Sequence, residues 1–238
     1  MSEDWPRELF IEKAELYQLE LEERLARAEE EAELLIKLFR AHGVPSGGKI
    51  LDLCCGIGRH SVALAKRGYF VVGVDFSPKF LERAAKLAEE ADVQERVEFV
   101  LHDVRELQKF PKKDFDAVIC LFTSFGYYSE DEDRKLLVST RKLVKPGGIF
   151  VLDVHNRDHL VREFRPHNVA KLPRYMVVEE GEFDLEKSRL HSRWLFFLRP
   201  PSPRPSPPER GRGEEKEEWV YAGKAKVSLR EYSLHELI

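Results

Sequence analysis

The chain has 238 residues, a formal net charge of −4 and 34% charged residues. This length suits one domain with elaborations, and the interspersed charges of both signs argue against a nucleic-acid-binding surface. No apolar run approaches the roughly 18 residues that span a bilayer, and the N-terminus has no signal-peptide pattern. The three cysteines have neither disulfide nor metal-ligand spacing, which indicates a reducing cytoplasm and no metal site.

The first part of the chain, residues 1–44, is predicted to be a helical cover. Apolar residues recur there at steps of three and four between residues 6 and 41, a pattern typical of one amphipathic helix or of two with a break. Two compatible roles follow. The helix packs on the core or on a second subunit, and its start, with Trp5, Phe10 and Tyr17, closes over an active site.

Residues 45–158 alternate between strands and helices. Strands that are almost wholly apolar and alternate with helices predict a parallel sheet covered on both faces, which is a Rossmann-like, doubly wound α/β fold. The predicted strands are 49–53, 69–74, 97–101, 115–121 and 147–154, and the predicted helices are 59–67, 78–91, 104–109 and 130–144.

The turn after the first predicted strand is the most informative segment of the chain. Residues 50–58 read ILDLCCGIG, an apolar run that ends in Asp52 and continues into a small-residue turn. Gly56 and Gly58 remove side chains where a ligand approaches the backbone. The Asp52 carboxylate would repel a pyrophosphate, whereas a sulfonium ligand with an ammonium group and a ribose benefits from it.

Acids also end the next two predicted strands. Asp75 is placed to accept hydrogen bonds from both hydroxyls of a ribose. Ser77 then caps a helix that has Pro78 at its first position. Asp103 has two open interpretations, as an acceptor for an adenine amine or as the cap of the following helix.

Five segments together resemble the class I S-adenosylmethionine-dependent methyltransferases of the small-molecule type. They are ILDLCCGIG (50–58), VVGVDFS (71–77), LHDVREL (101–107), FDAVICLFTSFGYY (115–128) and LVKPGGIFVLDV (143–154). The resemblance implies an enzyme that transfers a methyl group from S-adenosylmethionine to a small molecule by in-line displacement. One departure is Cys54, which stands where most of these enzymes have a glycine. The implied cofactor-binding residues are Asp52, Cys54, Gly56, Gly58, Arg59, Asp75, Phe76, Ser77, Asp103, Val104, Phe122 and Thr123.

The substrate side of the site is less specific. The candidates for substrate binding are Tyr17, Phe125, Tyr127 and Asn156, and the candidates for catalysis are His155 and Tyr127. Methyl transfer from a sulfonium requires no general base, so no catalytic residue can be named firmly. Residues 121–128 lack the Asn/Asp-Pro-Pro-Tyr/Phe motif of enzymes that methylate nucleic-acid amines, which is a second argument against a nucleic-acid substrate. The acceptor and its reacting atom stay open.

After residue 158 the pattern changes to an antiparallel lobe, residues 159–238, with strands at 176–183, 189–198 and 218–230. A Pro/Arg-rich insertion at 199–216 is expected to be extended. The resembled family continues with a helix and two further strands, so we expect a truncated final helix and a sheet that lacks its last two strands. The outer edge of strand 149–154 would then be covered by the lobe or by a second copy in a homodimer.

Two rival functions come from other classes. One is a non-catalytic sensor or scaffold that binds S-adenosylmethionine. The other is a nicotinamide-dependent oxidoreductase, against which Asp52 argues, together with Ser61 at the position of the third glycine.

Overall fold

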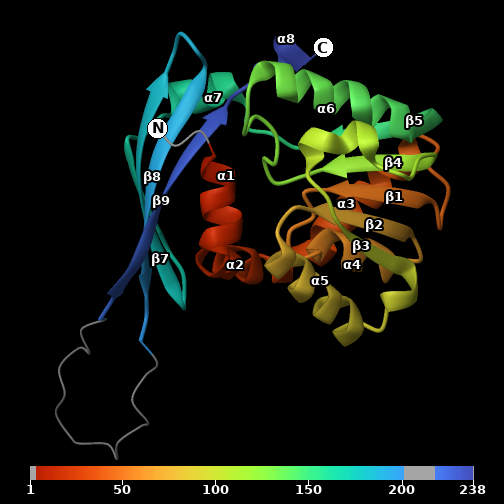
Figure 1. Ribbon diagram of the computed structural model, residues 1–238, viewed down its shortest axis with the longest axis horizontal. Coiled ribbons are helices and arrows are strands. Elements are labelled where there is room, and N and C mark those ends of the chain that lie inside the picture. Colours follow the sequence, from red (N-terminus) through yellow and green to blue (C-terminus); the bar gives the residue numbers. More distant parts are fainter. Residues whose placement is uncertain (1–3, 201–217, 238) are drawn as a thin grey trace, which may run out of the picture.

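The computed structural model describes residues 4–200 and 218–237, which form two β-sheets with helices around them. The two sheets lie apart, and the N-terminal helices α1 (Trp5–Arg7) and α2 (Ala14–Glu23) lie between them (Figure 1). No helix in these two ranges is long and apolar enough to cross a bilayer.

The first sheet is parallel throughout and has the strand order β3-β2-β1-β4-β5. This arrangement confirms the predicted Rossmann-like α/β sheet. The order reverses between β1 and β4, and open α/β sheets bind ligands at such a point. The strands are β1 (Lys49–Leu53), β2 (Phe70–Asp75), β3 (Val97–Leu101), β4 (Phe115–Cys120) and β5 (Val144–Leu152).

Helices cover both faces of the parallel sheet. Neighbouring residues of β1 point to opposite faces: Ile50 belongs to a core cluster with Phe39, and Leu51 belongs to another with Leu136. All four side chains are buried. The covering elements are α3 (Ala28–Ala41), α4 (Arg59–Ala65), α5 (Pro78–Glu90) and α6 (Glu130–Leu143), with short 3₁₀ helices η3 (Gln94–Arg96) and η4 (Val104–Lys109).

Local sequence explains where α5 and α6 begin. Ser77 accepts a hydrogen bond from the Phe80 N–H, and Pro78 takes the first helical position. Ser129 and Glu132 form a capping box, in which each side chain accepts a hydrogen bond from the other residue's N–H.

The N-terminal helical pattern is present, but the helix is broken. The π-helix η1 (Glu8–Glu12) follows α1, and Lys13 interrupts the helix between η1 and α2. The 3₁₀ helix η2 (Leu25–Arg27) separates α2 from α3. The two ends of the segment therefore pack differently. Phe39 of α3 is buried in the core of the parallel domain, whereas Phe10 is buried in a cluster with side chains of the antiparallel sheet.

The second sheet is antiparallel and has the order β6-β7-β8-β9. Strands β7 (Tyr175–Asp184), β8 (Arg189–Leu198) and β9 (Val220–Arg230) confirm the predicted lobe, whereas β6 (His167–Lys171) was not predicted. All five residues of β6 are exposed, so it has no alternating pattern. Short helices α7 (Arg157–Arg162) and α8 (Leu234–Leu237) flank the sheet in the chain. Most of the predicted insertion at 199–216 lies outside the described residues.

The outer edge of β5 differs from the prediction. The sequence pattern predicted a strand buried on both faces, but residues 149–152 are only half-buried. The strands of the antiparallel lobe pair with one another and not with this edge, so a cover from the lobe would not come from strand pairing. Within the described residues, β5 has β4 as its single strand partner.

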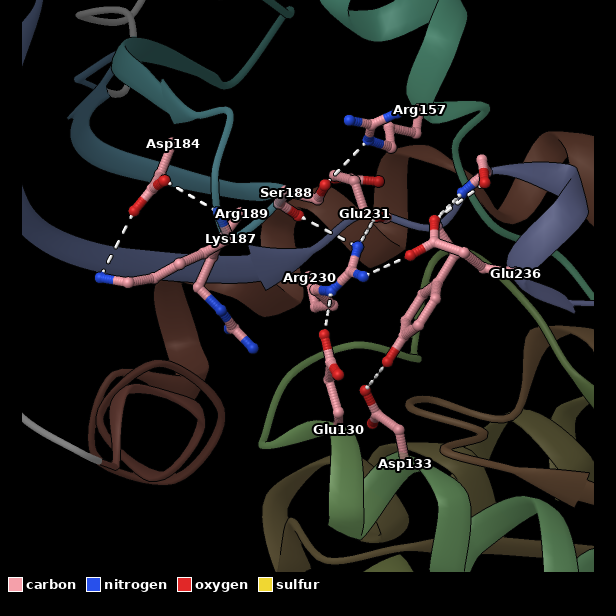
Figure 2. A network of polar contacts seen from close by, with 12 residues as sticks. Glu130, Asp133, Arg157, Asp184, Lys187, Ser188, Arg189, Arg230, Glu231 and Glu236 are labelled. Carbon is pink, nitrogen blue, oxygen red and sulfur yellow. Dashed lines mark hydrogen bonds and ion pairs between the residues drawn. The ribbon is translucent and has the colours of Figure 1, made fainter.

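A network of polar contacts joins the antiparallel sheet to the parallel domain (Figure 2). Its centre is Arg230, at the end of β9, whose side chain is 8% exposed. The guanidinium lies 2.8 Å from Glu130 and 2.5 Å from Glu236, and it also donates to the carbonyl oxygens of Ser188 and Glu231. One buried cation therefore binds α6, α8 and two loops together.

Two further contacts tie the same region to the loop after β4, and a third ties it to α6. The Arg230 N–H donates to the Gly126 carbonyl at 2.7 Å, and Arg189 donates to the Tyr128 carbonyl at 2.5 Å. Tyr232 donates to the Asp133 carboxylate at 2.6 Å. A Cβ atom on Gly126 would lie 2.2 Å from the Arg230 carbonyl oxygen, so this close approach requires glycine.

Candidate functional site

A cleft lies at the carboxyl ends of the parallel strands, and we call it the strand-tip cleft. Its free volume is about 70 Å³. Leu21, Tyr17 and Phe10 of the N-terminal segment line it together with the strand tips, so this segment forms one wall. The predicted site residues that line it are Tyr17, Asp52, Cys54, Gly56, Arg59, Asp75, Phe76, Val104, Phe122, Phe125 and Tyr127.

Asp75, at the tip of β2, is held by backbone donors. Its two carboxylate oxygens accept hydrogen bonds from the N–H groups of Gly56 and Ser77, each at 2.9 Å. The residue is 6% exposed. Burial raises the pKa of this carboxyl to about 6, against the lowering effect of the two backbone hydrogen bonds. A buried acid with fixed lone pairs is suited to receive hydroxyl groups of a ligand.

Asp52, at the tip of β1, is more buried than Asp75. It accepts a hydrogen bond from the Ser61 hydroxyl at 2.6 Å and is 2% exposed. Burial raises the pKa of this carboxyl as well. Ser61 is therefore a hydrogen-bond partner of Asp52. This role requires a hydroxyl group, which a glycine at position 61 would not supply.

The turn itself has backbone angles that favour glycine. Cys54 has φ 56° and Gly56 has φ 56°. A left-handed conformation costs a non-glycine residue roughly 1–2 kcal/mol. Replacing the usual glycine of the family by Cys54 therefore has a small energetic cost. At Gly56 an added Cβ atom would point at Leu21, 3.3 Å from its nearest methyl carbon, within the wall of the cleft.

Gly58 has a packing role in the structure. An added Cβ atom would lie 2.7 Å from the Phe99 ring and 2.9 Å from Ala84. The residue therefore allows α4 and α5 to approach β3, and it does not line the cleft. The predicted contact between Gly58 and a ligand has no support in this geometry.

Arg59 and His60 share one partner. Both contact the Glu31 carboxylate of α3, His60 at 2.8 Å. The hydrogen bond from His60, with Arg59 beside it, lowers the pKa of Glu31 to about 2 although partial burial opposes this. The Arg59 guanidinium also lies 5.4 Å from the centre of the Phe122 ring. Arg59 thus forms part of the cleft wall through a fixed ion pair.

Three predicted site residues act as helix caps. Ser77 caps α5 and donates its hydroxyl proton to the Phe10 carbonyl at 2.6 Å, which anchors the N-terminal segment. Asp103 caps η4 through the Arg105 N–H and pairs with the Arg105 guanidinium at 2.6 Å. Asn156 caps α7 and is exposed. Of the two interpretations of Asp103, the structure contains the cap, and neither Asp103 nor Asn156 lines the cleft.

The loop after β4 is strained. Phe122 and Thr123 both have φ 58°, which is rare for a non-glycine residue and especially for a β-branched one. Asp153 holds both residues: its carboxylate accepts from the Phe122 N–H at 3.0 Å and its carbonyl accepts from the Thr123 N–H at 3.1 Å. Strain of this kind, maintained by fixed contacts, is common at functional sites.

A second cavity lies between the N-terminal segment, this loop and the antiparallel sheet, and we call it the inter-sheet cavity. Its volume is about 280 Å³. Phe10, Tyr17, Phe122 and Tyr127 line both this cavity and the strand-tip cleft, so the two adjoin. Its polar lining comes from Glu20, Arg24, Thr123, His155, Asn168 and Glu179, and the antiparallel sheet adds Val177, Trp194, Phe196, Val227 and Leu229.

Several of these residues already have partners. Glu20 pairs with Arg24 at 2.5 Å, and Glu179 accepts from the Trp194 indole at 3.2 Å. Burial raises the pKa of the Tyr127 hydroxyl well above its ordinary value, so this group stays protonated. The Trp5 indole N–H is different, because it is buried and no described residue accepts its hydrogen bond. Trp5 also lines the inter-sheet cavity.

The described residues contain no group of three His, Cys, Asp or Glu side chains that could hold a metal ion. The strand-tip cleft instead offers two buried carboxylates, backbone N–H groups of a tight turn and aromatic walls. This set of groups fits an organic ligand with hydroxyl groups and a positive charge.

Comparison with known proteins gives the family. Residues 50–148 match the model of the methyltransferase domain, and this part of the chain supplies the strand tips that line the strand-tip cleft. The chain carries a class I S-adenosylmethionine-dependent methyltransferase domain. The resemblance inferred from the five sequence segments is thereby confirmed.

Several curated relatives of this methyltransferase domain are named for glycine or sarcosine. The chain is 39% identical over 137 residues to the glycine/sarcosine N-methyltransferase of Parasynechococcus marenigrum (strain WH8102), covering 57% of this chain and 47% of the relative. It is 31% identical over 163 residues to the glycine N-methyltransferase of Homo sapiens, covering 63% of this chain and 54% of that enzyme. The chain therefore spans about half the length of the curated relatives that it matches.

Solved structures agree on the fold over a larger share of the chain. An S-adenosylmethionine-dependent methyltransferase from Clostridium acetobutylicum matches with a TM-score of 0.69 and 19% identity, covering 87% of this chain and 75% of that one. Streptomyces venezuelae DesVI matches with a TM-score of 0.66 and 20% identity, covering 94% of this chain and 86% of that one. The likeness thus extends beyond the methyltransferase domain to the antiparallel lobe.

Sequence reasoning missed several lining residues. Leu21 belongs to a helical stripe, and its position in the cleft depends on the breaks in the N-terminal helix. Trp194 lies on a strand with a period-two pattern, which signals a buried face but not a cavity. Glu231, a buried acid beside His155, follows β9 and carries no sequence signal, because its importance depends on a contact between distant parts of the chain.

Proposed function

We propose that this protein transfers a methyl group from S-adenosylmethionine to a nitrogen atom of a small molecule. The observation that carries the proposal is the junction of the strand-tip cleft with the inter-sheet cavity at Phe122 and Tyr127. One space has the groups of a cofactor site, and the other, with a volume of about 280 Å³, is of small-molecule size.

The chain's own residues fit the cofactor. Asp75 would accept the ribose hydroxyls, and the turn at Gly56 would let the ligand approach the backbone, while Phe76 and Val104 line the side of the cleft. When bound, S-adenosylmethionine supplies a methyl group on a positively charged sulfur, whose carbon–sulfur bond breaks with the electron pair retained by sulfur. The free volume of about 70 Å³ is well below the roughly 300–1,000 Å³ of small-molecule pockets, so Leu21 and its neighbours move aside on binding.

The inter-sheet cavity favours a small amine that also carries an oxygen acceptor. Aromatic rings from Phe10, Tyr17, Tyr127 and Trp194 suit a positively charged nitrogen. The orphan Trp5 N–H calls for a hydrogen-bond acceptor such as a carboxylate oxygen. The N-methyltransferase relatives, which by name act on glycine or sarcosine, support the same class of acceptor.

Other parts of the proposal concern partners and location. The inter-sheet cavity is of small-molecule size, so we propose no nucleic-acid substrate. Among the described residues the outer edge of β5 has no strand partner, which supports a homodimer. The three cysteines are free thiols, which supports a reducing cytoplasm as the location.

Two measurements test the function. Calorimetry with S-adenosylhomocysteine and with NAD distinguishes the cofactors, and we expect binding of the former alone. Mass spectrometry of a panel of small amines, alcohols and thiols incubated with S-adenosylmethionine then tests turnover, and we expect methylated amines. Binding without turnover across the panel would favour the rival role as a non-catalytic sensor.

A further inference from the structure

His155 and Glu231 form a hydrogen-bonded pair at the inter-sheet cavity. The Nδ1 atom of His155, which follows β5, lies 3.2 Å from Oε1 of Glu231, which follows β9. Glu231 is 1% exposed, and its backbone N–H donates to the Ser188 carbonyl at 2.9 Å. The backbone of Glu231 is therefore anchored and its side chain is buried, while the imidazole of His155 is half exposed.

The hydrogen bond determines which ring nitrogen is available. A carboxylate accepts hydrogen bonds, so Nδ1 of a neutral His155 carries the proton that is donated to Glu231. The Nε2 atom is then an unprotonated acceptor. No residue in the described part of the chain forms a hydrogen bond with Nε2.

His155 also has the right surroundings for a proton acceptor. It lines the inter-sheet cavity with Thr123 and Tyr127, and it also lines a neighbouring cavity. The inter-sheet cavity is where we propose that the acceptor binds, and the imidazole is also half exposed to solvent. A proton taken up at Nε2 therefore has a route out.

The other titratable groups of the inter-sheet cavity do not offer this chemistry. Burial raises the pKa values of Tyr17 and Tyr127, so both hydroxyls keep their protons near neutral pH. Glu20 accepts a hydrogen bond from the Tyr175 hydroxyl and pairs with Arg24. Glu179 already accepts hydrogen bonds from Ser192 and Trp194.

We infer that His155 is the proton acceptor of the reaction and that Glu231 is the residue that positions it. This inference rests on the proposed function, because it assigns the proton that the amine must lose. An amine bound as its ammonium ion has no lone pair. Its proton moves to Nε2 of His155, and the freed lone pair forms the bond to the methyl carbon as the carbon–sulfur bond breaks. His155 then releases the proton to water.

The charges around His155 support this role. The hydrogen bond to Glu231 raises the pKa of the imidazole against the opposing effect of burial, and nearby acids add to the rise. The charged groups near the imidazole are Asp153, which follows β5, Glu179 from β7, Glu163 and Arg165 from the segment around the end of α7, and Glu231. Four of the five are acids, and they stabilise the imidazolium after proton transfer.

The test compares His155→Gln and Glu231→Gln with the parent chain, with His159→Gln on exposed α7 as the matched control. For the parent, kcat/KM with an amine rises with pH and levels off above the pKa of His155. For His155→Gln, we expect kcat/KM at pH 7 to fall about 100-fold and to keep rising until the amine itself deprotonates. For Glu231→Gln, we expect the levelling-off to move to lower pH.

Independent readouts separate this inference from the proposed function. Titration of the imidazole by NMR requires no turnover, and the pKa of His155 should fall in Glu231→Gln and stay unchanged in His159→Gln. Affinity for S-adenosylhomocysteine should be the same in all four proteins. If His155→Gln keeps the parent's rate and pH profile, the inference is overturned while the proposed function stands. If the parent methylates nothing in the panel, both fail.

Discussion

The Arg230 guanidinium lies 2.8 Å from the Glu130 carboxylate, across the junction between β9 and the first turn of α6. The same guanidinium binds Glu236 and two carbonyl oxygens, and its side chain is nearly buried. The junction therefore depends on a single cation that could not leave without exposing several unpaired acceptors.

We predict that Arg230→Ala lowers the free energy of unfolding by about 1–3 kcal/mol, because the carbonyl oxygens of Ser188 and Glu231 lose a buried donor. The control is Arg193→Ala, because Arg193 pairs with Glu180 on an exposed part of the antiparallel sheet. It should cost less than about 1 kcal/mol. Urea denaturation of both variants measures the difference, and equal effects would contradict the role given to Arg230.

A pair of glycine variants tests the strand-tip cleft. Gly56 and Gly68 both have positive φ, 56° and 91°, but a Cβ atom on Gly68 would meet open space. Alanine at either position should therefore destabilise the fold by a similar amount, about 1–2 kcal/mol. Calorimetry should find at least tenfold weaker binding of S-adenosylhomocysteine to Gly56→Ala and unchanged binding to Gly68→Ala. Unchanged binding to both would mean that the ligand lies elsewhere.

The pKa of Asp75 predicts how cofactor binding depends on pH. Because this carboxyl titrates at about 6, its ionised form dominates at pH 7 and is lost at pH 5. If ribose hydroxyls donate to the ionised form, affinity for S-adenosylhomocysteine should fall by up to about tenfold per pH unit below 6. Calorimetry between pH 5 and 8 measures this slope. The Asp75→Asn variant should bind S-adenosylhomocysteine more weakly, and its affinity should not change with pH in this range.

The Asp75 carboxyl also makes the free energy of unfolding depend on pH, and its contribution decreases as pH rises. The folded-state pKa lies above the value of about 3.9 for an unfolded chain, so the folded state binds the proton more tightly. The contribution of Asp75 to stability is complete below pH 4 and is lost as pH rises through about 6, a change of about 3 kcal/mol. Comparison of the parent with Asp75→Asn isolates this contribution, and identical pH dependence of unfolding would refute it.

We predict that the indole N–H of Trp5 contributes to binding of the methyl acceptor. Its buried indole N–H has no partner among the described residues, and Trp5 is one of the residues that line the inter-sheet cavity. Trp5→Phe keeps an aromatic ring but removes the donor, so KM for the acceptor should rise about tenfold, the value of one hydrogen bond, with kcat unchanged. Trp219→Phe is the control, because Trp219 contacts Lys171 and Arg199 away from the cavity. Equal KM values for both variants would exclude the donor role.

The outer edge of β5 predicts self-association. Exposed N–H and C=O groups along a half-buried apolar strand invite pairing with another strand. Light scattering should give twice the mass of one chain, and the amide protons of residues 149–152 should exchange slowly. A monomer at every concentration, with fast exchange at this edge, would contradict the proposed homodimer.

The sequence was sufficient for the parallel sheet because its signals are local. Apolar runs such as 70–74 and 115–120, followed by acids or small turns, specify buried strands without reference to distant residues. Asp52, Asp75 and Gly56 were recognised for the same reason, since the turn that holds them is contiguous.

Other features depend on contacts that no local pattern records. Strand β6 is exposed along its whole length, so only its pairing with β7 makes it a strand. Gly58 was interpreted as a ligand contact, but its neighbours Phe99 and Ala84 come from later elements. The pair of His155 and Glu231 is separated by 76 positions. The spacing of apolar residues predicts which face of a helix or strand is buried. It does not predict which other elements pack against that face.

The position of the N-terminal segment between the two sheets affects how the chain folds during synthesis. Trp5, Leu9 and Phe10 share one buried cluster with Ala225 and Val227. These partners lie on β9, which follows the whole parallel domain in the chain, so the first helices lack them while the nascent parallel domain already has most of its strands. Contacts between such distant positions form slowly. The wall of the inter-sheet cavity is therefore completed only after β9 has been made.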